Sequence, residues 1–273
     1  MRAFRLKFVT LVCAIALSFM SAAVAKASDP ELSKEQMKEF LLKAKVLSSK
    51  HTSKGITDPW RLTLSDGTVT HEAVFQSVDV HKPTMQFADG TTEINFVDSY
   101  KYNIAAYALA ELLGMDDMLP VHVERKWNGQ VGSLSWFLPV KMDEVERLKR
   151  KISAPDTDAW NKQMYKIRVF DELAYDNDPN LTNVLIGENW QIWRVDFSRA
   201  FRLSKDLKNP NNLVRCDRQL LEKLKALNEN EFTQKTKNFL TKYEVQGVMA
   251  RRDKIVAYFQ KLIAQKGENE VLY

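Results

Sequence analysis

The chain has 273 residues, two cysteines and a formal net charge of +5. Without the basic N-terminal segment described next, the net charge falls to +2, which argues against a nucleic-acid-binding protein. Cys216 is then the one cysteine left, so no intrachain disulfide can form, and roughly 245 residues remain for one two-lobed unit or two small domains.

Residues 1–25 are predicted to be a signal peptide. Three basic residues lead into the short apolar stretch Phe8–Met20, and Ala23-Val24-Ala25 matches a cleavage site of the A-x-A type. The apolar stretch is too short, and wrongly flanked, for a stable membrane span. We therefore expect an exported protein, either periplasmic or secreted.

The chain next favours a helix followed by a hairpin. Residues 28–50 predict a charged amphipathic helix, because Ser33-Lys-Glu-Gln36 matches a capping box. Residues 61–64 and 69–80 then predict two strands around the turn Ser65-Asp66-Gly67.

A loop, a buried helix and a second hairpin are predicted after these strands. Residues 81–98 are polar and mixed, which is typical of a long loop. Tyr100–Leu113 carries an apolar stripe and is followed by a glycine, which indicates a helix that faces the core. Residues 121–127 and 131–140 flank Asn128-Gly129, a strong signal for a hairpin turn.

The pattern becomes helical in the second half of the chain. Helices are predicted at residues 143–151, 160–175, 220–227, 231–240 and 245–263. A strand-rich N-lobe at residues 26–140 and a helical C-lobe at residues 141–273 together predict an α+β architecture of two lobes. A cleft between lobes is a usual place for a ligand.

Three oxygen-bearing side chains follow the helix predicted at residues 160–175. Asp178 and Asn183 lie five residues apart in a polar loop, and Asp196 follows two short apolar runs that predict a hairpin. Asp-x4-Asn, a hairpin and a further Asp is the layout with which kinase-type phosphotransferases hold a base and a metal. A carboxylate must meet the attacking hydroxyl, while an amide and a second carboxylate hold Mg²⁺ against the phosphates.

The stretch Val169–Phe201 resembles the active-site region of atypical kinases, namely the HipA-type kinases, the phosphoinositide kinases and the secretory-pathway kinases related to Golgi casein kinase. Their loop commonly reads FDxLixNxDRxxxN and precedes a strand that ends in a metal-binding Asp; here Phe170-Asp171 begins the match. The resemblance implies a two-lobed protein-kinase-like fold. It also implies Asp178 as the catalytic acid/base, Asn183 and Asp196 as metal ligands, and ATP or another nucleoside triphosphate with Mg²⁺ or Mn²⁺ as cofactors.

Two further segments extend the resemblance, and two positions depart from it. Asp98–Arg125 looks like helix C and the following strand of these kinases, and Gln246–Ile263 resembles the closing helix of uncharacterised secreted bacterial relatives. Pro179 stands where the family often has Arg. Phe197-Ser198 follows Asp196 in place of Phe-Gly, so the backbone freedom of glycine is absent there.

A third departure concerns the nucleotide side of the site. Kinases pair a Lys on the phosphates with a Glu of helix C, but the matching positions here are Gln76 and Asn103. The two amides can hydrogen-bond each other and the phosphates, as an uncharged form of the clamp. Alternatively Lys82 or Lys101 reaches the site with Glu93 as its partner. In a third alternative the fold is kept and catalysis is lost.

The function that the resemblance implies is an exported kinase-like phosphotransferase acting on a hydroxyl acceptor, with protein, sugar and lipid headgroup all open. The alternative is a catalytically inactive kinase-fold binding module in the cell envelope. A structural envelope protein whose acidic loop binds Ca²⁺ is a third interpretation. Neither a nucleic-acid partner nor a stable membrane span is expected, and the sequence leaves the oligomeric state open.

Overall fold

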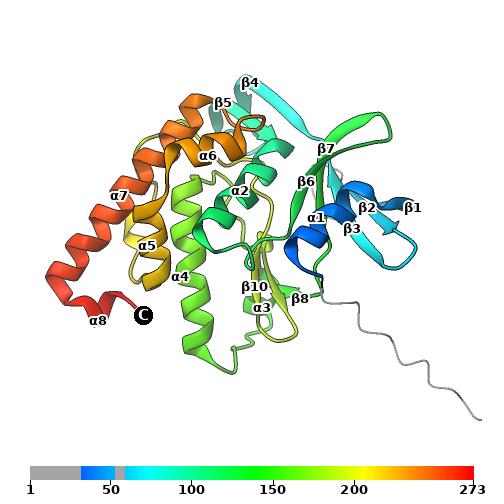
Figure 1. Ribbon diagram of the computed structural model, residues 1–273. Helices are drawn as coiled ribbons and strands as arrows, with labels where there is room; N and C mark the ends of the chain where they lie inside the picture. Colours follow the sequence, from blue (N-terminus) through cyan, green and yellow to red (C-terminus); the bar gives the residue numbers. More distant parts are fainter. Residues whose placement is uncertain (1–31, 53–58) are drawn as a thin grey trace, which may run out of the picture. The chain divides into compact units, whose positions relative to one another are not determined.

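A five-stranded sheet occupies the first half of the chain and most helices belong to the second half (Figure 1). The computed structural model describes residues 32–52 and 59–273, and Leu32–Tyr273 forms one compact unit. The predicted signal peptide, residues 1–25, lies outside the described residues. The α+β class expected from the sequence is confirmed.

The five strands run antiparallel to their neighbours in the order β1-β2-β3-β7-β6. Their bounds are Lys45–His51 (β1), Trp60–Ser65 (β2), Thr70–Gln76 (β3), His122–Trp127 (β6) and Gln130–Trp136 (β7). Both predicted hairpins are confirmed, β2 with β3 and β6 with β7. Asn128 and Gly129 have φ values of 48° and 79°, the left-handed conformation that a two-residue hairpin turn requires.

The N-terminal helix is shorter than expected. Helix α1 (Lys34–Lys43) begins with the predicted capping box, in which Ser33 and Gln36 each accept a hydrogen bond from the other's backbone N–H. The chain becomes extended at Ala44, and the next residues form β1 against β2. The prediction of a helix up to residue 50 was wrong, because pairing with β2 outweighs a weak local helix preference.

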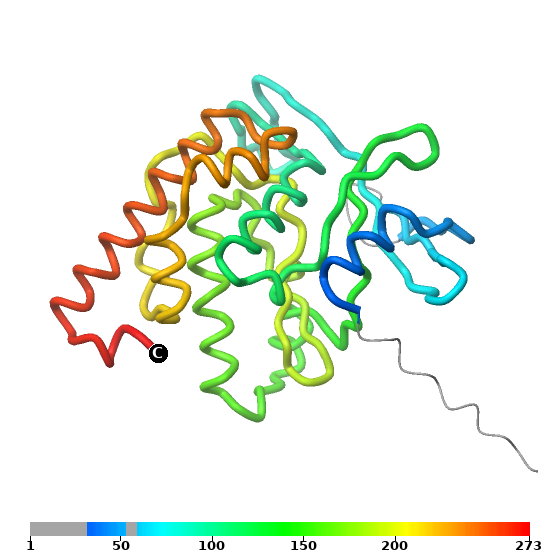
Figure 2. The backbone as a smooth tube through the Cα atoms, in the orientation of Figure 1, coloured from blue at the N-terminus to red at the C-terminus, as the bar shows by residue number. Residues whose placement is uncertain are grey.

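A separate two-stranded hairpin replaces the loop predicted at residues 81–98. Strands β4 (Asp79–Gln86) and β5 (Thr92–Ser99) pair along their full length. Figure 2 shows the hairpin leaving the chain after β3 and returning to the start of the next helix. Most of its side chains are exposed, so the strands lack the alternation of apolar and polar residues that identifies a half-buried strand. This is why the prediction of a loop was wrong.

Helix α2 (Tyr100–Leu113) lies at the centre of the fold. It packs against β6 and β7 of the sheet and against two helices of the second half, so 11 of its 14 residues are buried. As predicted, it ends at a glycine: Gly114 has a left-handed φ of 65° and closes the last turn. A helix packed on several sides brings any polar residue it carries into the interior, which is the situation of Asn103.

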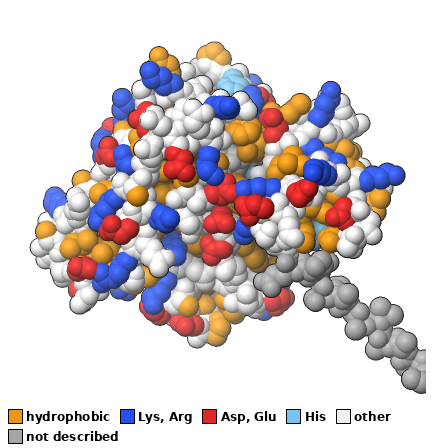
Figure 3. Space-filling view, viewed as in Figure 1, with side chains coloured by type: hydrophobic (Ala, Val, Ile, Leu, Met, Phe, Trp, Pro, Cys, Tyr) orange, Lys and Arg blue, Asp and Glu red, His pale blue; other side chains and the backbone are white. Residues whose placement is uncertain are grey.

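The helices of the second half agree with the five predicted, with boundary shifts of a few residues. They are α3 (Glu144–Lys149), α4 (Thr157–Ala174), α5 (Arg218–Ala226), α6 (Glu229–Thr236) and α7 (Lys242–Lys266), followed by the short α8 (Glu268–Val271). Among the helices of the described ranges, none has the length and apolar character that a membrane crossing requires. On the face drawn in Figure 3, acidic and basic side chains are interspersed, in keeping with the small net charge.

A small three-stranded sheet is formed by one strand that precedes α3 and two strands that follow α4, and it carries one end of the site. Its strands are β8 (Val140–Asp143), β9 (Val184–Gly187) and β10 (Ile192–Arg194), in the order β10-β9-β8. The hairpin predicted before Asp196 is therefore confirmed. The strand predicted at residues 131–140 ends earlier, at Trp136, because Val140 instead pairs with Gly187.

Candidate active site

A cavity of about 550 Å³ lies between the five-stranded sheet and the β9–β10 hairpin. This volume is within the range typical of small-molecule sites. Its walls include parts of β3, β6, β7, β9 and α2, the segment after β7, and the chain on either side of the β9–β10 hairpin. The lining residues used below are Val74, Gln76, Asn103, His122, Asn183, Leu185 and Asp196.

The loop after α4 is held in place by the buried end of that helix. Phe170 and Leu173 are buried, and Tyr175 ends the helix with a left-handed φ of 50°. The next residues fold back on themselves: the N–H of Asp178 donates to Asp176 Oδ1 at 3.0 Å, and the N–H of Asn180 donates to the Asp178 carbonyl at 2.7 Å. The Asp178 side chain is left about half exposed, at 51%. A substrate can therefore reach it from solvent.

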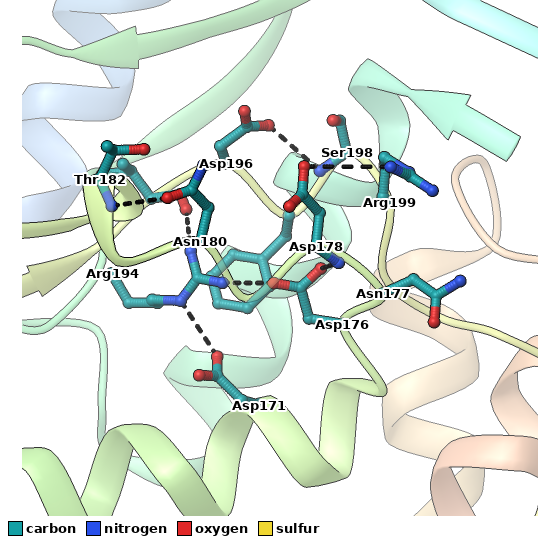
Figure 4. Close-up of polar contacts among 12 residues, drawn as sticks. Asp171, Asp176, Asn177, Asp178, Asn180, Thr182, Arg194, Asp196, Ser198 and Arg199 are labelled. Carbon is teal, nitrogen blue, oxygen red and sulfur yellow. Dashed lines mark hydrogen bonds and ion pairs between the residues drawn. The ribbon is translucent and has the colours of Figure 1, made fainter. Parts of the chain in front are cut away.

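Asn183 and Asp196 are brought to the same cavity by backbone pairing. The N–H of Val195 donates to the Asn183 carbonyl at 3.0 Å, which ties the loop to the end of β10. Asp196 then takes a φ of 59°, a left-handed value that is unfavourable for a residue other than glycine. Its carboxylate lies 3.4 Å from the N–H of Ser198 (Figure 4). Both residues line the cavity, as the three-residue pattern predicts.

Asp178 belongs to the same neighbourhood, although it does not line the cavity. A third carboxylate, Asp98 at the end of β5, shows this: burial is the main cause that raises its pKa, and the negative charges of Asp196 and Asp178 raise it further. Its Oδ1 is buried without a hydrogen-bond partner among the described residues. In Figure 4, Asp178 meets Arg199, and the N–H of Ser198 meets Asp196.

Asp98 is a site residue that the sequence analysis missed. It falls in the stretch predicted as a loop, and its closeness to Asp178 depends on the pairing of β4 with β5. The one available signal is its position directly before Ser99, the residue that caps α2. A residue at that place is carried with the helix to the site.

A chain of side-chain amides joins the sheet to the Asp196 segment. Asn103 is 3% exposed; its Nδ2 donates to Gln76 Oε1 at 2.7 Å, and its Oδ1 accepts from the N–H of Phe197 at 2.7 Å. The two neutral residues singled out in the sequence therefore bond each other. Asn103 also fixes the residue that follows Asp196.

The other proposed partners lie elsewhere. Lys101 binds Asp79 at 2.7 Å, Lys82 lies 3.7 Å from the sulfur of Met85, and neither lysine lines the 550 Å³ cavity. Glu93 does not line it either. The expectation that one of these lysines reaches the site with Glu93 is not met, because β4 and β5 carry Lys82 and Glu93 away from the cavity wall and Asp79 holds Lys101.

Glu93 instead pairs with Arg199 and Arg202, the two basic residues that follow Asp196. Arg199 also lies over the rings of Phe87 and Phe96, at 5.2 and 5.1 Å, and its Nη1 is 4.0 Å from the Asp178 carboxylate. The β4–β5 hairpin is thus attached to the chain next to the site by ion pairs.

No protein-family model matches the chain, and no curated protein matches it either. Among solved structures, it is similar to hydra Fam20 described with sugar, with a TM-score of 0.60 and 14% identity over 88% of this chain and 91% of that one. It is also similar to the Helicobacter pylori proinflammatory kinase CtkA, with a TM-score of 0.52 and 9% identity over 81% of this chain and 97% of that one. The chain has an atypical kinase-like fold.

The hydrogen-bonded side chains of Gln76 and Asn103, called the amide pair below, connect a strand with a helix. Protein kinases carry a Lys on the third strand and pair it with a Glu of helix C. Here Gln76 ends β3 and Asn103 lies in α2, and a direct hydrogen bond joins their side chains. This contact between strand and helix is made without charge.

The side-chain oxygen atoms of Asn183 and Asp196 fit a hard divalent cation. Asp196 offers a carboxylate and Asn183 an amide oxygen, the ligand types that Mg²⁺ and Mn²⁺ prefer. In the described part of the chain, no group of three or more His, Cys, Asp or Glu side chains is placed to hold a metal by itself. Nucleotide sites commonly need one or two protein ligands, since the phosphates supply others. Asn183 and Asp196 meet that requirement.

Proposed function

We propose that the protein is a phosphotransferase that passes the terminal phosphoryl group of ATP, or of another nucleoside triphosphate, to a hydroxyl acceptor. The observation that carries this proposal is the cavity shared by Asn183, Asp196 and the amide pair of Gln76 and Asn103, with the accessible Asp178 close by. Kinase-type phosphotransfer needs these three functions, metal binding, phosphate orientation and a base, in one place.

Each residue of the loop and strand has a distinct role in this proposal. Asp178 accepts the proton of the acceptor hydroxyl as its oxygen attacks in line, and its exposed side chain leaves room for that acceptor. Asn183 and Asp196 hold Mg²⁺ or Mn²⁺, which, when bound, neutralises the charge of the phosphates. The link from Val195 to Asn183 keeps these two ligands in one register.

Other residues that line the cavity suit the rest of the nucleotide. Gln76, braced by Asn103, is placed to orient phosphate oxygens through an uncharged amide. Val74 from the sheet and Leu185 from the β9–β10 hairpin offer apolar surface on two sides of the cavity, as a flat base requires. Charge-assisted hydrogen bonds are stronger than neutral ones, so we expect weaker nucleotide binding than with a Lys–Glu pair.

From the predicted signal peptide we also propose that the protein acts outside the cytoplasm. An exported phosphotransferase meets acceptors of the periplasm or the surroundings of the cell, so protein, sugar and lipid headgroup hydroxyls are the acceptors to test. The exposure of Asp178 supports an acceptor that is larger than the cavity, because the base is reached from outside it.

A catalytically inactive nucleotide-binding or partner-binding module is the second candidate. The neutral Gln76–Asn103 pair favours it, because the positive charge that usually meets the phosphates is absent from that position. The intact Asp178, Asn183 and Asp196 favour catalysis.

Nucleotide binding and turnover separate the two candidates. Purified protein is titrated with ATP and Mn²⁺ in thermal unfolding, where a ligand at 100 times its Kd adds about 2.7 kcal/mol to the free energy of unfolding. We expect Asp196→Asn to abolish the metal-dependent gain, and Asp178→Asn to keep it while abolishing transfer of labelled phosphate. Asp206→Asn, at an exposed carboxylate paired with Lys254, is the control and should match the wild type. Binding without transfer in the wild type would support the inactive module, and neither binding nor transfer would end the proposal.

A further inference from the structure

The guanidinium of Arg194 is buried directly behind the candidate site. Arg194 is the last residue of β10 and is 1% exposed. Its Nε donates to Asp171 Oδ1 at 3.2 Å, its Nη2 donates to Asp176, and its Nη1 donates to the carbonyl of Val195. Figure 4 shows it between α4, which carries Asp171, and the loop that contains Asp178. One side chain therefore binds three segments of the chain.

Through Asp176, this side chain reaches the backbone of the proposed base. Asp176 is 2% exposed, and its two oxygens have separate partners: Oδ2 accepts from Arg194 and Oδ1 accepts from the N–H of Asp178. The position of Asp178 is thus set by a two-step connection to Arg194.

At its other side, Arg194 fixes the proposed metal ligand Asp196. Its bond to the Val195 carbonyl holds the peptide group directly before Asp196, and its guanidinium lies 4.9 Å from the ring of Phe197, directly after it. Asp196 has the unfavourable φ of 59°, which persists only when neighbouring contacts fix it. The contacts to Val195 and Phe197 meet that need together with Asn103.

The charges explain why this position needs an arginine. A buried guanidinium is tolerated when carboxylates and hydrogen bonds satisfy it, and Asp171 and Asp176 do so here. Burial raises the pKa of Asp171 to about 6, and it also raises the pKa of Asp176, while the Arg194 charge opposes both shifts. A lysine offers a single point of charge and cannot bind three acceptors in a planar fork.

We propose that Arg194 is a positioning residue that fixes the separation between Asp178 and Asp196. This inference rests on the proposed phosphotransfer function. Arg194 contacts no residue of the amide pair and is not part of the cavity wall, so it affects nucleotide binding only through Asp196. The rate of transfer depends on it, because a displacement of about 1 Å in a catalytic group costs roughly 100-fold in rate.

The test compares Arg194→Lys with Arg125→Lys in the full chain. Arg125 also makes a forked contact, to the carbonyls of Leu41 and Ala44, but it joins α1 to the sheet away from the cavity. With ATP and Mn²⁺, we expect Arg194→Lys to lower kcat by roughly 100-fold and to raise KM for ATP by a much smaller factor, because both proposed ligands are still present. Arg125→Lys should leave both values unchanged.

Hydrogen exchange supplies a second readout that needs no turnover. In Arg194→Lys, amide exchange should rise at residues 176–183 and 195–198 together and stay unchanged in α7. If the wild type turns over no nucleotide, the proposed function fails, and the exchange result still decides the role of Arg194. Unchanged exchange in either segment, or a rise throughout the chain, would overturn the positioning role, as would a raised KM with kcat intact.

A second variant covers the case in which Arg194→Lys does not fold. Arg194→Met combined with Asp176→Asn removes both charges of the innermost pair and leaves only Asp171, which is 23% exposed, without its cation. It lacks the fork and should show the same loss of kcat and the same local exchange. Failure of both variants to fold would assign Arg194 to overall stability and overturn the proposal.

Discussion

The side-chain amide of Asn103 donates to Gln76 Oε1 at 2.7 Å, and its oxygen accepts from the N–H of Phe197 at 2.7 Å. One buried residue of α2 therefore connects the end of β3 with the segment that carries Asp196. In kinases the contact between helix C and the third strand is an ion pair. Here the contact between β3 and α2 is made by neutral groups.

Loss of Asn103 should cost more stability than loss of Gln76. Asn103→Leu leaves the backbone N–H of Phe197 without its acceptor and also removes the bond to Gln76, whereas Gln76→Met leaves the bond between Asn103 and Phe197 in place. A buried donor without a partner costs about 1–3 kcal/mol. Urea unfolding should show a loss of that size for Asn103→Leu and a smaller loss for Gln76→Met. Equal losses would mean that the bond to Phe197 contributes nothing.

Restoring the ion pair should strengthen nucleotide binding. In the double variant Gln76→Lys with Asn103→Glu, the carboxylate still accepts from Phe197, and the lysine brings a positive charge to the cavity. Charged hydrogen bonds are roughly twice as strong as neutral ones, so we expect roughly tenfold tighter binding of ATP with Mn²⁺ by calorimetry. Asn103→Glu alone is the control, and it should be destabilised by a buried unpaired carboxylate. Binding no tighter than in the wild type would place the phosphates elsewhere.

His122 should make the protein sensitive to mild acid. The residue is partly exposed at the cavity wall, but its Nδ1 is enclosed without a partner in the described residues, and burial lowers its pKa from 6.5 to about 3. As the pH falls below 6.5, His122 becomes protonated in the unfolded chain but stays neutral in the folded chain. Stability therefore falls by up to about 1.4 kcal/mol per pH unit between pH 6.5 and about 3.

The measurement is urea unfolding of the wild type and His122→Asn at pH 7, 6, 5 and 4. The difference between the two proteins isolates this histidine from the other titrating groups. The variant should lose less stability at each step. His81→Gln, at an exposed histidine, is the control and should follow the wild type. Parallel curves for wild type and His122→Asn would contradict the assignment.

Asp98 should destabilise the fold at neutral pH. Burial, followed by the nearby charges of Asp196 and Asp178, raises its pKa above 3.8, so the folded chain disfavours its ionised form. Asp98→Asn should then raise the free energy of unfolding at pH 7 by roughly 1 kcal/mol, the usual scale of a single substitution. The gain should shrink toward pH 4, where the carboxyl of the wild type is increasingly protonated. A gain that does not change with pH would exclude a charge effect.

Sequence patterns correctly predicted the elements whose turns and helix ends are specified by a few neighbouring residues. The turn at Asn128-Gly129, the capping box at Ser33 and the glycine after α2 each satisfy a backbone requirement within a few residues. Strand β1 and the β4–β5 hairpin depend instead on pairing, and their exposed side chains carry no period. Sequence patterns therefore missed them.

In the candidate site, too, sequence patterns identified residues that lie close together in the chain and missed contacts between distant elements. Asp178, Asn183 and Asp196 lie within one loop and one hairpin, so their spacing alone indicated that they belong together. Asp98 and the Arg194–Asp176 pair join elements far apart in the fold, and no short motif describes such a contact. The Gln76–Asn103 bond was one of three alternatives, because the resemblance to kinases identified both residues but not whether their side chains meet.

The ion pairs of Glu93 should hold the β4–β5 hairpin beside the site. Glu93→Gln leaves the guanidinium groups of Arg199 and Arg202 without their carboxylate. These side chains are 12–18% exposed, so the loss should stay below the ~3–5 kcal/mol typical of a fully buried pair. Hydrogen exchange should rise across residues 79–99 and remain unchanged in α7. Glu188→Gln is the matched control, since Glu188 is 78% exposed beside Lys141 and its pair should contribute ~1 kcal/mol or less. Equal effects of the two changes would show that the hairpin is held by its backbone alone.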